Sequence, residues 1–193
     1  LALGLLAGSL GAPYIPTRTL LGSDIARANP TFREATSPFD GSRILLVPPI
    51  EPDVTVIAVQ RADDEGNAHL WGPWGVSQEA ALAARAVIVV ADELVPREVI
   101  RGDPSRTIVP GMKVAAVVVE AGACHPSPLQ GRYERDHDLF HEYHEATRTE
   151  EGFAAWIAEW VTGVPDRRPY LAKLGERWER LRVLGEPAAE VRY

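Results

Sequence analysis

A polar loop at residues 121–131 carries the side chains best suited to hold a ligand. It reads AGACHPSPLQG and offers His125, Ser127 and Gln130 as hydrogen-bonding groups. It follows the run KVAAVVV at residues 113–119, which is typical of a strand buried on both faces of a parallel sheet. Loops at the carboxyl ends of such strands commonly form ligand crevices. We therefore expect these three residues to contact a carboxylate or thioester oxygen, with a rigid turn that only positions the next helix as the alternative.

Three histidines after this loop have spacing that could suit a metal ion. His137, His141 and His144 stand at i, i+4 and i+7 of a predicted helix at residues 136–144. A true site also needs ligands from other elements, and a charged, solvated helix face gives the same pattern. We expect no metal here.

Two other groups could do nucleophilic or acid–base chemistry. Cys124 precedes His125, but neighbours in an extended chain point to opposite sides, which argues against a thiol–imidazole pair. Asp92, Glu93 and Glu98 follow a predicted strand at residues 86–90 and could supply a base or nucleophile. We favour the alternative, in which they cap a short helix at residues 94–101.

The elements that position these residues alternate loosely between strands and helices, which indicates an α/β fold. Strands are predicted at residues 44–47, 54–59, 69–71, 86–90 and 113–119, and helices at 1–11, 76–85, 94–101, 136–144, 150–161 and 168–184. Residues 11–43 are rich in Pro, Gly, Ser and Asn and are expected to be mostly loop. Arg18 in this segment is a candidate ligand contact, with a solvated arginine as the alternative.

Composition narrows the class of protein. The 193 residues are enough for one domain, so we predict a single domain over residues 1–193. A formal net charge of −7 without a lysine- or arginine-dense block argues against nucleic acid as a partner. The apolar start at residues 1–11 is too short to span a bilayer and lacks a basic leader, so we expect no membrane partner. One cysteine fits a reducing, cytoplasmic location.

Seven short motifs, in order along nearly the whole chain, carry a family resemblance. The sequence resembles the alpha (A) subunit of family I CoA-transferases of the glutaconate CoA-transferase type. The matching pieces are PYIPTR at 13–18, GNAHLWG at 66–72, DELV at 92–95, VPG at 109–111, HPS at 125–127, QG at 130–131 and RDH at 135–137. Relatives of the alpha type carry a further N-terminal region with a glycine-rich turn that has no counterpart in this sequence.

The resemblance implies a parallel-sheet, CoA-transferase-like α/β domain with C-terminal helices. It implies an enzyme that moves CoA between an acyl-CoA and a carboxylic acid, with the CoA thioester as substrate and no permanently bound cofactor. The partner would be a beta subunit, in a heterodimer or heterotetramer, that supplies the nucleophilic glutamate. This chain would then hold no catalytic residue, and its substrate-binding residues would be His125, Ser127, Gln130, Gly131 and Arg18.

Two other functions stay open. The chain could belong to a related hydrolase that opens the ring of a CoA thioester, using a glutamate of the alpha subunit from the region without counterpart here. The chain could also be an inactive or truncated binding module. The beta subunit discriminates between them, because a nucleophilic glutamate there favours transfer.

Overall fold

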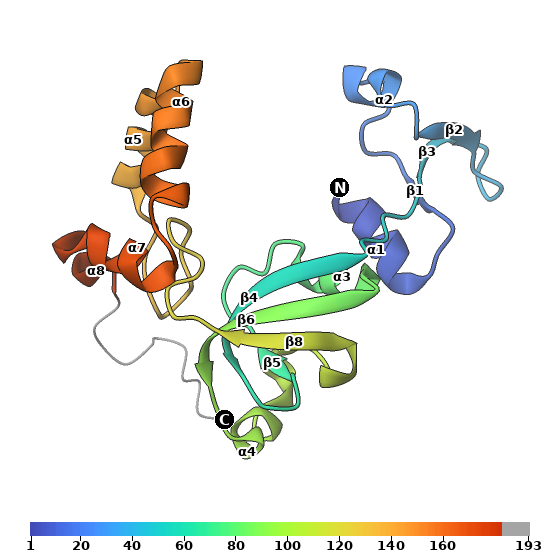
Figure 1. Cartoon of the computed structure of the whole chain (residues 1–193). Coiled ribbons are helices and arrows are strands. Elements are labelled where there is room, and N and C mark those ends of the chain that lie inside the picture. Colours follow the sequence, from blue (N-terminus) through green and yellow to red (C-terminus); the bar gives the residue numbers. More distant parts are fainter. Residues whose placement is uncertain (183–193) are drawn as a thin grey trace.

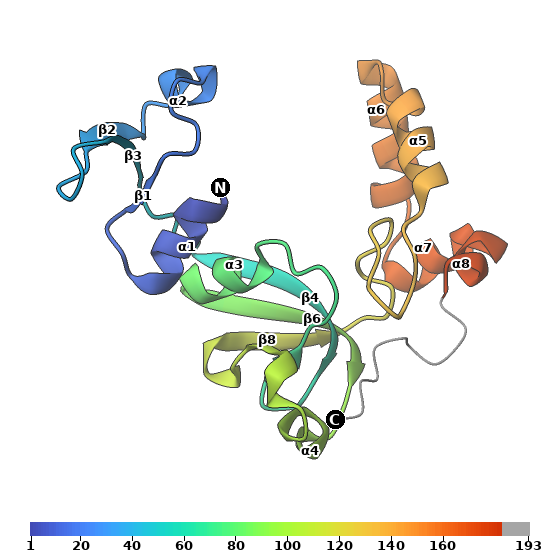
Figure 2. The same ribbon diagram turned by 180° about the vertical axis from the view of Figure 1, so that it is seen from behind.

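A five-stranded sheet forms the centre of the computed structural model, which describes residues 1–182 (Figures 1 and 2). Its strand order is β7-β5-β4-β6-β8. Strands β4 (Val54–Ala62), β6 (Ala86–Leu94) and β8 (Val114–Val119) are parallel to one another, whereas β5 (Ala68–His69) and β7 (Thr107–Val109) join antiparallel at one side. The predicted α/β fold with a mostly parallel sheet is confirmed.

One face of this sheet carries the hydrophobic core. Alternate residues of β6 are fully enclosed there, and β4 contributes Ile57 and Val59 to the same face. Helix α3 (Ser77–Ala83) packs against it through Ala81, and Thr55 donates a hydrogen bond from its hydroxyl to the Ala80 carbonyl. This alternation follows from the two-residue period of a strand.

The opposite face is aliphatic but open, so the expectation that strand 113–119 is buried on both faces is wrong. Four of the six residues of β8 are exposed, because it is the last strand of the sheet. On β4, which is separated from β8 by β6, Val54 is 52% and Val56 62% exposed. No other strand or helix within residues 1–182 covers these side chains.

The outer edge of β4 is also largely free within the described part of the chain. Strand β5 pairs with β4 only at Arg61 and Ala62, whereas β6 pairs along its whole length. Half of the backbone groups of residues 54–60 therefore point toward an unfilled edge.

Helix α1 (Ala2–Leu10) lies close to α3 and ends at Gly11, whose φ of 63° is left-handed. Gly8 permits the close approach, because a Cβ there would lie 2.4 Å from the Ile50 carbonyl oxygen and 3.1 Å from Ala83 Cβ. The predicted helix at residues 1–11 is confirmed.

Residues 11–43 form an arm that is mostly loop, as predicted, but that also contains short regular elements. A small antiparallel sheet has the order β1-β3-β2 and includes the helix α2 between its strands (Figure 1). The bounds are β1 (Ile15–Thr17), α2 (Asp24–Ala28), β2 (Arg33–Thr36) and β3 (Arg43–Val47). Strand β3 was predicted at residues 44–47, whereas β1, α2 and β2 are too short to show a hydrophobic period in the sequence.

Helices on the far side of the sheet form a second arm (Figures 1 and 2). They are α5 (His137–Ala146), α6 (Glu150–Ile157), the π-helix Ala158–Thr162, α7 (Arg167–Leu174) and α8 (Glu176–Leu181). The helix predicted at residues 168–184 is broken at Gly175, which has a φ of 54°. The last two residues of that prediction lie outside the described part of the chain.

The boundaries of the remaining elements differ from those predicted. Helix α4 (Arg97–Arg101) begins three residues later than predicted, because β6 continues to Leu94. Short 3₁₀ turns lie at Pro104–Arg106 and Gly111–Lys113. Within residues 1–182, no helix has the length and hydropathy needed to cross a bilayer.

Candidate functional site

The loop after β8 lies at the carboxyl ends of the three parallel strands, as the sequence predicts. Asp92 of β6 fixes its start, since its Oδ1 accepts a hydrogen bond from the Gly122 N–H at 2.8 Å. Gly122 has a φ of 76°, and a Cβ there would lie 2.9 Å from the Trp178 ring. A glycine is therefore required where the loop passes under α8.

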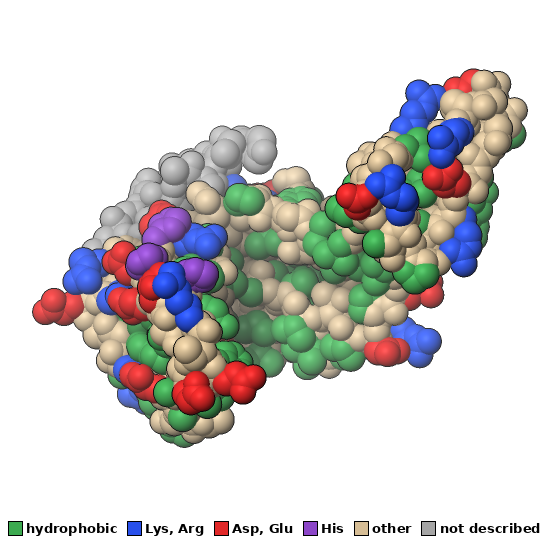
Figure 3. All heavy atoms as spheres, turned by 90° about the horizontal axis from the view of Figure 1, so that it is seen from above, with side chains coloured by type: hydrophobic (Ala, Val, Ile, Leu, Met, Phe, Trp, Pro, Cys, Tyr) green, Lys and Arg blue, Asp and Glu red, His purple; other side chains and the backbone are tan. Residues whose placement is uncertain are grey.

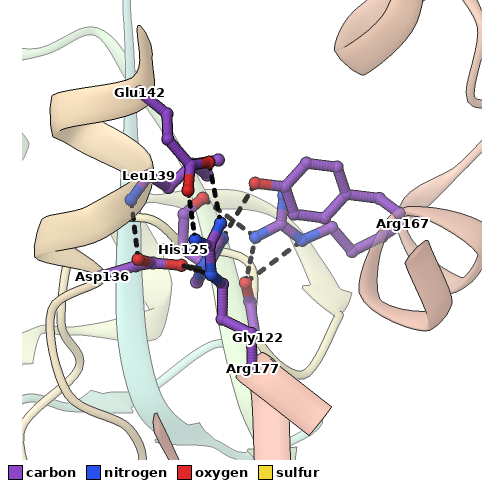
Figure 4. A network of polar contacts seen from close by, with 8 residues as sticks. Gly122, His125, Asp136, Leu139, Glu142, Arg167 and Arg177 are labelled. Atoms are coloured by element: carbon purple, nitrogen blue, oxygen red, sulfur yellow. Dashed lines mark hydrogen bonds and ion pairs between the residues drawn. The ribbon is translucent and has the colours of Figure 1, made fainter. Parts of the chain in front are cut away.

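His125 lies in a buried polar network that ties this loop to the second arm (Figure 4). Its side chain is fully enclosed, with Nε2 3.0 Å from Asp136 Oδ2 and Nδ1 2.8 Å from the Tyr170 hydroxyl. Burial lowers the pKa of His125, while the hydrogen bond to Asp136 acts in the opposite direction. The partners assign a neutral ring in which Nε2–H donates to Asp136 and Nδ1 accepts from Tyr170.

Two arginines extend this network (Figure 4). Arg167 donates to the Gly122 carbonyl and, at 3.0 Å, to the His125 carbonyl. Arg177 Nε lies 3.7 Å from Asp136 Oδ2, and its guanidinium pairs with Glu142 and lowers the pKa of that carboxyl. Arg167 of α7 thus holds the loop backbone directly, whereas Arg177 of α8 supports the network through the side chains of Asp136 and Glu142.

A pocket of about 320 Å³ opens beside this loop, against the free edge of β4. Its walls come from β4, from the segment after β5 and from the loop itself. The lining includes Val56, Gln60, Trp71, Ser77, Cys124 and Gln130. No carboxylate lines it among the residues that the structure describes. Figure 3 shows hydrophobic side chains in the hollow between the two arms.

Gln60 joins two walls of the pocket and was not singled out from the sequence. It is fully buried, and its Nε2 donates to the Trp71 carbonyl at 3.0 Å and the Gln130 carbonyl at 3.1 Å. Its Oε1 accepts from the Trp71 N–H at 3.2 Å. A glutamine at the end of an apolar strand is the signal that could have indicated this role, since a buried amide needs several partners.

The structure does not bring the predicted binding residues together at one site. Gln130 lines the pocket, and Gly131 follows it with a φ of 75°. Ser127 is exposed on the loop and His125 faces the buried network, so neither is among the lining side chains. Arg18 lies in the first arm, where it pairs with Asp40 at 2.9 Å and is 70% exposed.

The interpretation that the carboxylates after residue 91 stabilise the start of a helix is wrong for Asp92 and Glu93 and holds in part for Glu98. Asp92 and Glu93 lie within β6, where Glu93 Oε2 is 2.5 Å from Arg132 Nη2. Glu98 is in the first turn of α4, whose N-cap residue is Pro96 and which has no side-chain cap. The longer strand removes Asp92 and Glu93 from capping distance of the helix, whereas the charge of Glu98 in the first turn is favourable to the helix dipole.

Cys124 has no imidazole partner. Both ring nitrogens of His125 are already engaged, and the Cys124 N–H donates to the Tyr133 hydroxyl at 2.9 Å. Burial raises the pKa of the Cys124 thiol, which disfavours the thiolate.

The three histidines of α5 lie on an exposed helix surface, on the arm whose histidines stand out in Figure 3. Across residues 1–182, no three His, Cys, Asp or Glu side chains are grouped to hold a metal ion.

Aromatic side chains of the second arm enclose a separate apolar pocket of about 270 Å³. Trp156 and Trp160 stack with ring centroids 5.4 Å apart and line it, together with Tyr143 and Tyr170. Trp178 instead packs against His125 and Tyr133 at the core. The tryptophans therefore divide between two places: Trp156 and Trp160 line the apolar pocket of the second arm, and Trp178 packs at the core.

Comparisons with known proteins give consistent results over most of the chain. Residues 1–120 match the family described as Coenzyme A transferase. The A subunit of 3-oxoadipate CoA-transferase from Pseudomonas knackmussii is 38% identical over 176 residues, which cover 91% of this chain and 62% of that protein.

Glutaconate CoA-transferase from Acidaminococcus fermentans is similar in sequence and structure. Its A subunit is 32% identical over 185 residues, covering 88% of this chain and 58% of that protein. Its crystal structure superposes with a TM-score of 0.86 at 31% identity, over 95% of this chain and 63% of that chain.

A more distant relative is the IpdA subunit of a cholesterol ring-cleaving hydrolase from Rhodococcus jostii. It is 24% identical over 172 residues, covering 84% of this chain and 58% of that protein. The chain spans less than two thirds of the length of each of these relatives.

Proposed function

Because the chain belongs to the coenzyme A transferase family, we propose that it is the substrate-binding part of the alpha subunit in an acyl-CoA:carboxylate CoA-transferase. A beta subunit completes the enzyme, in a heterodimer or heterotetramer, and supplies the nucleophilic glutamate. CoA enters as a thioester substrate and not as a resident cofactor. The enzyme acts in the cytoplasm, in keeping with the single cysteine of the chain.

The composition of the pocket carries this proposal. Aliphatic residues of β4 form one wall, and Gln60, Ser77 and Gln130 provide neutral polar groups. The described lining includes no carboxylate that could attack a thioester. A pocket that can hold an acyl group but lacks a nucleophile fits a subunit whose partner carries the reactive residue.

The proposed reaction proceeds in two covalent stages on the partner's glutamate. Its carboxylate attacks the acyl-CoA carbonyl, and the C–S bond breaks to give an acyl–glutamyl anhydride and the CoA thiolate. The thiolate then attacks the glutamyl carbonyl, releasing the first acid and leaving a glutamyl–CoA thioester. A second acid repeats these steps in reverse and leaves as its CoA thioester.

The residues of this chain bind and orient the acyl group in this scheme. Gln130 offers an amide N–H to the carbonyl oxygen on which negative charge develops, and Gln60 fixes the backbone that carries it. Val56 and Trp71 exclude water from the acyl chain. His125 acts indirectly, since its buried network holds the loop in place.

Ring-opening hydrolysis of a CoA thioester is the second candidate function. The hydrolase subunit with 24% identity favours it, although the transferase subunits are more similar at 32% and 38%. The two activities differ in product, because hydrolysis consumes water and leaves CoA on the product. If the chain is a non-enzymatic binding module, neither product should form.

An exchange assay with the assembled enzyme separates these functions. The chain is co-expressed with the beta subunit encoded beside it, and transfer of CoA from an acyl-CoA to a labelled free acid is followed. We expect exchange only when both chains are present, and borohydride should trap the enzyme thioester on the beta subunit. Exchange by this chain alone would refute the proposal, as would hydrolysis without exchange.

A variant pair then tests the pocket. Gln130→Ala removes a side chain that lines it, whereas Gln78→Ala removes the same group from α3 outside the lining. We expect turnover to fall by about tenfold or more in Gln130→Ala, as for the loss of a donor to the transition state, and to stay near wild type in Gln78→Ala. Equal turnover in the two variants would exclude Gln130 from the site.

A further inference from the structure

One carboxylate contacts both ends of the loop at residues 122–132. Asp92, near the carboxyl end of β6, accepts a hydrogen bond at Oδ1 from the Gly122 N–H at 2.8 Å. Its second oxygen, Oδ2, lies 3.7 Å from Arg132 Nε, in an ion pair in which Asp92 is 13% and Arg132 29% exposed. The Asp92 side chain therefore ties the start and the end of the loop to the same point of the sheet.

Arg132 extends this attachment to a second strand. Its Nη2 lies 2.5 Å from Glu93 Oε2 and donates to the Gln60 carbonyl at 3.4 Å, so it contacts the ends of both β6 and β4. Its Nε is buried and has no hydrogen-bond acceptor within the described chain, and the Asp92 charge compensates this side of the guanidinium. Glu93 is 50% exposed, so solvent screens its ion pair more strongly than that of Asp92.

The buried network of His125 holds the same loop in a different direction. Arg167 of α7 donates to the Gly122 carbonyl at 3.1 Å, and the His125 ring bonds to side chains of the second arm. Asp92 instead accepts from the Gly122 N–H on the side of the sheet, which provides the β4 wall of the pocket. Asp92 therefore controls how the loop lies against the sheet, whereas the His125 network controls how it lies against the arm.

Two residues that line the pocket are close to these attachment points along the chain. Cys124 follows Gly122 by two residues, and Gln130 precedes Arg132 by two residues. Asp92 itself does not line the pocket. A side chain that fixes both ends of the loop without reaching the pocket acts on a bound acyl group only through the position of the lining residues.

We propose that Asp92 is a positioning residue for CoA transfer, and that its carboxylate holds the Gln130 amide at the distance from the β4 wall that the transition state requires. This role rests on the proposed transferase function. Without the carboxylate, the Gly122 N–H and the Arg132 guanidinium lose an acceptor together, and the loop shifts away from the sheet. A misplacement of about 1 Å in a catalytic arrangement can lower a rate by about a hundredfold, so a small shift is sufficient.

Steady-state kinetics of the assembled enzyme test this role. Asp92→Ala should lower kcat for exchange by about tenfold or more while KM for the acyl-CoA changes less, because Gln130 acts on the transition state. Asp92→Asn keeps an oxygen for the Gly122 N–H and should recover most of the loss. The control is Glu98→Gln, which changes an exposed carboxylate of α4 and should leave kcat unchanged.

A double-mutant cycle with Gln130 separates positioning from a merely structural role. In the Gln130→Ala background, Asp92→Ala should change kcat by less than about twofold, because the group that it positions is already absent. An equal factor in both backgrounds would refute the inference, as would an unchanged kcat in Asp92→Ala. Either result leaves the transferase function intact, since exchange by the wild-type enzyme is measured in the same assay.

Labelling of Cys124 in the full chain alone measures the loop position without any catalysis. Cys124 is the only cysteine of the sequence, and burial raises the pKa of its thiol, so Ellman's reagent should react slowly with the wild-type protein. Asp92→Ala should raise the labelling rate by about tenfold, and low concentrations of urea should not alter this rise, because the loop opens locally. Glu98→Gln should label at the wild-type rate.

The labelling result also separates this inference from the proposed function. An unchanged labelling rate in Asp92→Ala would refute the attachment of the loop by Asp92. Faster labelling, together with no exchange by any assembled variant or by the wild type, would keep the attachment but refute both the transferase function and the role of Asp92 in it. Thermal unfolding shows whether each variant is folded. If Asp92→Ala does not fold, Asp92→Asn provides the test, with smaller changes in kcat and labelling rate expected because only the ion pair with Arg132 is lost.

Discussion

Replacing Asp136 by asparagine tests whether the buried network holds the loop against the helices. The carboxylate is 3% exposed and uses both oxygens: Oδ2 accepts from His125 Nε2 and Oδ1 accepts from the Leu139 N–H at 2.8 Å. Asparagine has one carbonyl oxygen for these two donors, so its NH₂ group must face one of them. The ion pair with Arg177 is lost as well.

The expected cost follows from these contacts. A hydrogen bond to a charged group contributes about 1.5–3 kcal/mol, so Asp136→Asn should lower the free energy of unfolding by about 2 kcal/mol. Asp136→Ala also removes the N-cap of α5 and should cost about 1 kcal/mol more. At about 2–4 °C per kcal/mol for a chain of this size, the asparagine variant should melt about 4–8 °C lower.

Urea unfolding and thermal scans of the full chain measure these differences. The control is Asp138→Asn, which removes an exposed carboxylate from the first turn of the same helix and should cost about 0.5 kcal/mol. If Asp136→Asn and Asp138→Asn are equally stable, the network does not hold the loop, and the argument from buried hydrogen bonds fails.

Two further predictions concern pH and loop position. Burial lowers the pKa of both His125 and His69, so the unfolded chain binds more protons than the folded chain below about pH 6.5. The free energy of unfolding should therefore fall as the pH decreases through that value. Urea unfolding at pH 7.5 and 5.5 measures this difference, and equal stability at the two pH values would contradict the prediction. Gly72→Ala would place a Cβ 2.6 Å from Gln130 Cβ, whereas at Gly75 no atom lies within 4 Å. Both glycines have positive φ, so the strain is shared, and exchange activity should fall more in Gly72→Ala than in Gly75→Ala; the reverse order would refute the contact.

The local pattern of the sequence was sufficient to predict the strands at the centre of the main sheet. The runs at residues 54–59 and 86–90 are β-branched and uncharged, and both form parallel strands. The polar loop follows β8 at the carboxyl ends of these strands, which is the predicted place for a ligand crevice. Within the arm at residues 11–43, which was predicted as mostly loop, the short strands β1 and β2 were missed because they gain their order from pairing with β3.

The sequence predicted binding residues in the loop after β8, and the structure places only some of them at the pocket. Gln130 lines the pocket, whereas His125 is turned into the core by Asp136 and Tyr170, which lie 11 and 45 residues away along the chain. Nothing in the order HPS indicates which way the imidazole points, because that depends on groups brought close only by folding.

The sequence by itself determined the family, the α/β class and the loop that borders the pocket, because these depend on residue type, period and motif order along the chain. Tertiary structure decided which side chains share a site. Gln60, Trp71 and Gln130 line the pocket from three separate segments, and their contacts depend on strand register and loop packing.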